Sequence, residues 1–220
     1  MATMVEATTR GQAPTAATRA PWYRDRIRLI GGAVLAVLLL GVIAWVILSS
    51  ERRKEEFAAR SLNQARAAAE AGNLPLASSE LQRLIDTYGG TDAATEAVIT
   101  LNQVRMVNGQ SELAAVGLRE FIAKDPPRKY LAPAYGLLGT ALENSKRPGE
   151  AGEAFRSASR SAELEYLKAR YLIDAGRAYR AAGKPAEAAT AYRAVIDSFP
   201  KSASMTEAKV RLAELTDGKM

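Results

Sequence analysis

Three arginines near the carboxyl end of the chain have a type and spacing that could do chemistry. Arg170 and Arg177 are seven residues apart, which is two turns along one face of a helix, and Arg180 lies one turn further. Guanidinium groups in such a row can pair with carboxylates through charge-assisted hydrogen bonds. This row could therefore bind an acidic segment of a partner. An ordinary solvated helix face is the more common meaning of such a pattern.

Catalytic groups are scarce in the rest of the sequence. The 220 residues include no cysteine and no histidine, which removes disulfides, thiolate metal ligands and the commonest general base. No phosphate-binding loop, dinucleotide fingerprint or nucleophile elbow is present, and the carboxylates are scattered over polar helix faces. We expect no enzymatic activity, no cofactor, no metal and no small-molecule substrate.

Composition and charge indicate the fold class and exclude one class of partner. The chain has 43 alanines against 4 phenylalanines and 2 tryptophans, a bias typical of close-packed helices, so we expect an all-α protein. The net charge of +6 divides evenly, since residues 1–50 carry five basic and two acidic residues, and residues 51–220 carry 25 and 22. A nearly balanced main domain does not favour nucleic-acid binding.

An uncharged segment runs from Leu29 to Leu48. As a helix these twenty residues would span about 30 Å, the thickness of the hydrocarbon core of a bilayer. A cleaved signal peptide would have a shorter apolar region followed by a small-x-small site, so we predict a transmembrane helix over residues 28–49. Aromatic and basic residues typical of the membrane interface frame this helix, namely Trp22, Tyr23, Arg24, Arg26, Arg28 and Trp45.

Orientation depends on the charges that flank the span, and within about fifteen residues of it the two sides carry equal numbers of basic residues. The acidic residues Glu51, Glu55 and Glu56 weakly favour a cytoplasmic amino terminus. Residues 1–20 have almost no large apolar groups to bury, so we expect a flexible cytoplasmic tail, which extends over residues 1–27. The predicted localisation is the inner membrane, with a single pass and a periplasmic carboxy-terminal domain.

Beyond the span the sequence repeats itself every 37 residues. Alanine recurs at this interval, and large, mostly apolar residues follow four and seven positions later. These spacings place small and large residues on one helix face. Glycine recurs before each such helix and is suited to ending a preceding helix, with Lys146 as the exception. Each unit is therefore predicted to be a helical hairpin; the recurring alanines are Ala77, Ala114, Ala151 and Ala188.

The hairpins resemble the tetratricopeptide repeat family. The match is strongest over residues 169–202, where the family's small, aromatic and proline positions are Gly176, Tyr179, Gly183, Ala188, Tyr192 and Pro200. Earlier units keep fewer of these residues, and the first keeps only Gly72 and Ala77 clearly. The family period is 34 residues, so we expect the three extra residues to lengthen the connection between hairpins.

This resemblance implies an α-solenoid of four hairpins over residues 50–202, followed by a capping helix and tail over 203–220. In that helix Ser202 would be the cap, and Met205, Ala208, Leu212 and Leu215 would face inward. In the family the first helix of each hairpin lines the partner groove. The residues of this chain that the resemblance places there are Arg66, Gln103, Met106, Thr140, Glu143, Asn144, Arg170, Arg177 and Arg180.

The whole layout, with a short tail, one span and a small repeat domain, resembles the ancillary subunit of the Sec translocon that links the channel to periplasmic chaperones. It implies a membrane-tethered scaffold for protein–protein interactions in the bacterial envelope. The alternative is a structural accessory subunit of another large membrane complex, such as a respiratory, photosynthetic or secretion assembly. An inverted topology would instead give an adaptor that faces the cytoplasm. In each case the partners are other membrane or envelope proteins and the lipid bilayer.

Overall fold

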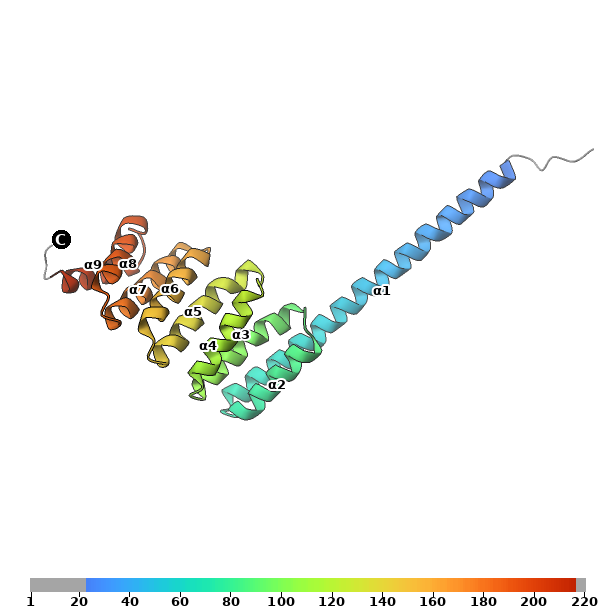
Figure 1. The fold of residues 1–220 in the computed structure, drawn as a ribbon. Coiled ribbons are helices and arrows are strands. Elements are labelled where there is room, and N and C mark those ends of the chain that lie inside the picture. The colour runs from blue at the N-terminus through green and yellow to red at the C-terminus, as the bar shows by residue number, and fades with distance from the viewer. Residues whose placement is uncertain (1–22, 217–220) are drawn as a thin grey trace, which may run out of the picture. The chain divides into compact units, whose positions relative to one another are not determined.

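The computed structural model describes residues 23–216, and all regular structure in this range is α-helical. It divides into two compact units, residues 1–50 and residues 51–220. Helices follow one another through short loops (Figure 1). Their bounds are α1 Tyr23–Glu70, α2 Leu74–Thr87, α3 Asp92–Val107, α4 Ser111–Ala123, α5 Arg128–Asn144, α6 Pro148–Ser161, α7 Glu165–Ala181, α8 Pro185–Ser198 and α9 Ser204–Leu215.

The described part of the first unit is the apolar half of α1. Its most apolar stretch has a mean hydropathy of 2.7 and, as far as residues 23–216 are concerned, none of it is buried. Trp45 is 67% exposed within it. This helix is long and apolar enough to cross a membrane. The other interface residues of the sequence prediction fall on parts not described, since Trp22 lies outside the described residues, as do the side chains of Tyr23, Arg24, Arg26 and Arg28.

The second unit consists of helical hairpins, as the repeat predicts. The pairs are the α1 segment from residue 51 with α2, then α3 with α4, α5 with α6, and α7 with α8, while α9 packs against both α7 and α8. The recurring alanines have no exposed surface, which confirms that they are helix-contact positions; they are Ala77, Ala114, Ala151 and Ala188.

The turn inside each hairpin has one residue with a left-handed backbone. Gly72, Gly109 and Gly183 have φ between 71° and 79°, and Lys146 takes the same conformation with φ 61°. Glycine adopts this conformation without the steric cost that a Cβ brings. The predicted turn position is therefore correct, and Lys146 is its strained member.

The prediction that the extra residues lengthen the connections between hairpins is wrong. Residues 88–91 join the first two hairpins and residues 162–164 join the last two, so these connections are about as short as the three-residue turns inside the hairpins. The first helices α3, α5 and α7 have 16 or 17 residues, whereas the second helices have 13 or 14. The longer period is therefore taken up by the helices themselves.

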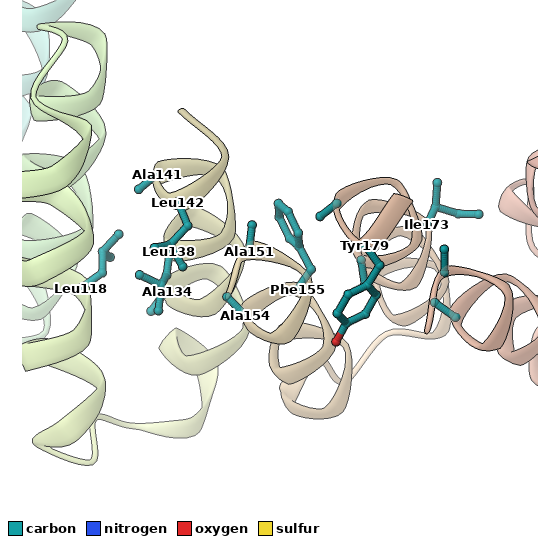
Figure 2. Packing of buried hydrophobic residues seen from close by; sticks show 14 of the residues in the cluster. Leu118, Ala134, Leu138, Ala141, Leu142, Ala151, Ala154, Phe155, Ile173 and Tyr179 are labelled. Atoms are coloured by element: carbon teal, nitrogen blue, oxygen red, sulfur yellow. The ribbon is translucent and has the colours of Figure 1, made fainter. Parts of the chain in front are cut away.

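Glycines inside the helices let aromatic rings lie against the backbone of a neighbouring helix. A Cβ on Gly139 would come within 2.6 Å of the Phe155 ring, and one on Gly152 would come equally close to the Tyr179 ring. Figure 2 shows Phe155 and Tyr179 among the buried residues of α5, α6 and α7. Small and large residues thus alternate across the helix contacts, and this pairing fills the core.

The carboxy-terminal helix covers the last hairpin. Ala208 and Leu212 of α9 are buried, and Leu215 packs against the same core. The Ser202 hydroxyl accepts a hydrogen bond from the Ser204 backbone N–H at 3.2 Å, so it satisfies one of the free donors at the start of α9. Three of the four predicted inward-facing residues are thus confirmed, whereas Met205 is half-buried and does not join the core. The N-cap of α9 is Ala203 rather than the predicted Ser202.

Candidate partner-binding surface

The first helices of the hairpins present one residue each at the same repeat position. These residues are Arg66, Gln103, Thr140 and Arg177, which are spaced by 37 and lie on α1, α3, α5 and α7. Together with Arg170 we call them the first-helix face. The structure brings Gln103, Thr140 and Arg170 together in a cavity of about 350 Å³ that α3, α5, α6 and α7 line.

Arg170 and Arg177, which the sequence places on one helix face, differ in their ion pairing. Arg177 pairs with Glu143 of α5 and with Asp174 of its own helix, in both cases at 3.2 Å. Arg170 is exposed and forms no ion pair within residues 23–216. Arg170 therefore has free donors for a new carboxylate, whereas Arg177 would have to exchange existing partners.

Asp174 separates these arginines along α7 and lines the same cavity. Its side chain is only 20% exposed. Burial raises the pKa of this carboxyl above its ordinary value, and nearby Arg177 and Arg170 oppose the shift. The cavity thus holds a partly desolvated acid and the unpaired guanidinium of Arg170, so it can accept both a carboxylate and a hydrogen-bond donor of a ligand. Arg177 pairs with that acid from outside the lining.

The shape of this cavity depends on residues that sequence reasoning missed. Tyr171 packs its ring on α5, because a Cβ on Gly136 would lie 2.6 Å from Tyr171 Cε1. Pro133 stands inside α5 and lines the cavity as well. For Asp174 a signal existed, since an acid four residues after Arg170 and three before Arg177 shares their helix face. For Tyr171 and Gly136 no single-helix pattern indicated the contact.

The remaining candidate residues lie outside this cavity, and two of them already form ion pairs with other helices. Arg66 pairs with Glu96 of α3 at 2.6 Å, and Arg180 pairs with Glu214 of α9 at 2.8 Å. Arg66 and Gln103 also line a second cavity of about 370 Å³ between α1 and α3. Met106 packs partly against the core, and Asn144 is exposed at the end of α5.

Most arginines of the set thus join neighbouring hairpins to one another or to α9. Exposed ion pairs of this kind are worth about 0.2–1 kcal/mol each, so a partner could displace them at small cost. Among the described residues, no cluster of three or more acidic side chains is arranged to hold a metal ion.

Comparisons with known proteins agree with this architecture. The family model for a tetratricopeptide repeat-like domain matches residues 21–217. No curated protein matches the chain. Among solved structures, MamA is similar with a TM-score of 0.58 at 20% identity, over 74% of this chain and 83% of that one. A Podosopora anserina putative kinesin light chain with TPR-like repeats gives 0.57 at 17% identity, over 72% and 85%.

At these identities the structural neighbours show the fold alone. The family match covers nearly the whole chain, and it agrees with the hairpins, the buried alanines and the left-handed turns described above. Domains of this kind are typically non-catalytic scaffolds for protein–protein interaction. The chain belongs to the tetratricopeptide repeat-like domain family.

Proposed function

We propose that this protein is a membrane-tethered scaffold of the bacterial envelope whose first-helix face binds an acidic segment of a partner protein. The observation that carries this proposal is the cavity that joins Gln103, Thr140 and Arg170 from three successive first helices. Arg170 has no ion pair within residues 23–216, so its guanidinium is available to a ligand. The apolar half of α1 supplies the anchor.

A membrane anchor lowers the affinity that the first-helix face needs for its partner. Confinement to a membrane raises the effective concentration of partners, so individual contacts can be weak. A charge-assisted hydrogen bond from Arg170 would contribute about 1.5–3 kcal/mol, equivalent to about a ten- to hundredfold change in affinity. Arg177 would contribute less because it must first leave Glu143 and Asp174.

Copurification from native membranes, with mass spectrometry of the bound proteins, tests the proposal. Arg170→Ala/Arg177→Ala should weaken recovery of the partner about tenfold or more, and Arg170→Ala alone should account for most of that loss. Arg193→Ala is the matched control, because this exposed arginine lies on α8, a second helix, and forms no ion pair within the described residues. Folding of each variant is checked by circular dichroism.

A different outcome would move recognition to the other unit of the chain. If the double variant retains its partner, while replacement of residues 1–50 by an unrelated anchor abolishes recovery, the tail and apolar helix carry recognition. The accessory-subunit alternative would then replace the scaffold proposal. The identity of the recovered proteins separates the two further, since a chaperone-linking role predicts translocon subunits and periplasmic chaperones.

Topology is tested separately. The proposal keeps Arg24, Arg26 and Arg28 in the cytoplasm and exports the hairpins. Protease added to spheroplasts should therefore digest residues 51–220. Protection of this domain until the membrane is lysed would place it in the cytoplasm and support the adaptor alternative.

A further inference from the structure

One repeat position on the first helices is filled differently in the second hairpin than in the two later hairpins. In the third and fourth hairpins this position carries Leu142 and Tyr179, large side chains that are each only 1% exposed and fill the slot next to the preceding hairpin. The residue 37 positions before Leu142 is Arg105, which is half-buried. The glycine position of Gly139 is likewise taken by a polar residue, Asn102. In the second hairpin the polar residues Asn102 and Arg105 thus replace the glycine and the large apolar residue that close the core in the third hairpin.

A cleft of about 450 Å³ lies at this slot, lined by α2, α3, α4 and the loops that follow α2 and α4. Its walls are largely apolar and include Ile85, Val98, Leu101 and Phe121. Gly117 keeps the cleft open on the α4 side, because a Cβ there would lie 2.7 Å from Asn102 Oδ1 and 3.1 Å from Arg105 Nη1. The cleft therefore depends on a specific combination of residues in α3 and α4.

Arg105 is held in this cleft by a neutral side chain, and the carboxylates of Glu120 and Asp125 on the rim lie beyond ion-pair distance of it. Asn102 is 1% exposed and donates from Nδ2 to the Val98 carbonyl at 2.9 Å, while its Oδ1 accepts from Arg105 Nη1 at 3.1 Å. Within residues 23–216 Arg105 forms no ion pair, so a neutral carboxamide orients the guanidinium and leaves most of its five N–H donors free.

The rim of the cleft contributes little to selectivity. Glu120, Lys124 and Asp125 line it and are exposed, so solvent and salt screen their charges. Arg105 is half-buried between apolar walls, where an ion pair is stronger than at the surface. The ligand group that best complements the cleft is therefore a carboxylate flanked by apolar groups.

The apolar surface continues out of the cleft along α4. Leu113 and Val116 are 48% and 46% exposed, and they stand one helical turn before Gly117 and Glu120 on the same side of the helix. A ligand that fills the cleft and also covers these residues must be longer than a single side chain.

We propose that this cleft is a second docking site, which takes an acidic side chain flanked by apolar residues from a partner protein. It is separate from the first-helix face. At 100° per residue, Val98, Asn102 and Arg105 project from the side of α3 opposite to Thr100 and Gln103, which line the cavities of that face. Two partners can therefore occupy the scaffold at the same time.

Selection of peptides tests the proposal on the full chain in lipid nanodiscs. A random dodecapeptide library displayed on phage is depleted on empty nanodiscs and on the Arg105→Leu variant, and then selected on the wild-type protein. The recovered peptides should carry Asp or Glu next to Leu, Ile, Val or Phe. A synthetic copy should lose at least tenfold in affinity on Arg105→Leu, and similarly when its own Glu is changed to Gln.

Three controls identify the site. Arg170→Ala should leave this affinity unchanged, whereas it weakens binding at the first-helix face, so the two proposals can fail independently. Arg105→Lys keeps the charge and should bind within about tenfold of wild type, and it separates loss of charge from any change in fold. Arg193→Leu should have no effect. Recovery of no peptide after depletion on Arg105→Leu, or peptides indifferent to their own acid, would overturn the proposal.

Discussion

Gly176→Ala is expected to destabilise the last hairpin although alanine is the better helix former. The added Cβ would lie 2.6 Å from Tyr192 Cζ and closer still to Cε1. Tyr192 has no exposed surface, so its ring has no free space to move into. Overpacking of this kind typically costs 1–3 kcal/mol, and the close approach favours about 3. The gain in helix propensity is about 1 kcal/mol, which leaves a net loss of about 2.

For a unit of this size such a loss lowers Tm by about 4–8 °C, measurable by circular dichroism of the full chain in detergent. Gly149→Ala is the matched control. Its Cβ would meet nothing closer than 3.8 Å, so this variant should keep or slightly raise Tm. The two substitutions are chemically identical and differ in the space around the new methyl group and in helix position, since Gly149 lies in the first turn of α6 and Gly176 in the interior of α7.

The chain itself suggests a compensating change. At the same repeat positions the first hairpin has Ala65 facing the core with Leu81, and both are buried. Gly176→Ala/Tyr192→Leu should therefore lose less stability than the sum of the two single variants, with a coupling of about 1 kcal/mol or more. A Tm of Gly176→Ala equal to wild type, or strictly additive losses, would refute the proposed glycine–ring packing.

Three further changes test other contacts by thermal unfolding. Ala188→Leu should lower stability by about 1–3 kcal/mol because the alanine has no exposed surface, and unchanged melting of it and of Ala151→Leu would contradict the packing register. Lys146→Gly should raise stability by about 1 kcal/mol because φ is 61° there, and a lower Tm would argue against strain. Asp174 has a pKa raised by burial, so its charged form opposes folding above that pKa. Asp174→Asn should therefore raise Tm at neutral pH, and this gain should fade as pH falls through the pKa; a gain that persists at low pH would contradict this cause.

The features that the sequence predicted correctly are those that follow a period. Buried alanines, left-handed turns and the inward face of the last helix repeat at a fixed interval or follow a helical period, so one chain is enough to find them. The ion pairs were not predictable in this way. Arg177 meets Glu143, 34 residues earlier, and Arg66 meets Glu96, 30 residues later. These offsets differ from 37 because each pair joins non-equivalent positions of two neighbouring first helices, so the repeat does not predict it.

The cavities were hidden for a related reason. The cavity of the first-helix face needs residues from four helices, and its boundary is set by contacts such as Tyr171 on Gly136. No period in the sequence connects those two residues. The connection lengths were mispredicted because a longer repeat can be absorbed by longer helices as well as by longer loops.

A pair of opposite substitutions can test why one residue departs from the 37-residue pattern. Arg105 and Leu142 occupy the same repeat position, but one borders an open cleft and the other is 1% exposed. Arg105→Leu should restore the apolar filling, so we expect Tm to stay equal or rise. Leu142→Arg should place an unpaired charge in a closed slot and cost about 3–5 kcal/mol.

Equal losses from the two changes would mean that Arg105 is a structural residue, because removal of a needed guanidinium would then destabilise the fold. Opposite signs would mean that the chain gives up stability at this slot. Residues that depart from the pattern of their repeat are expected at functional sites, where binding rather than stability decides the residue type. Asn102 also departs from its repeat position, and Gly117 leaves room beside Arg105, so the explanation for Arg105 is best sought in what the cleft binds.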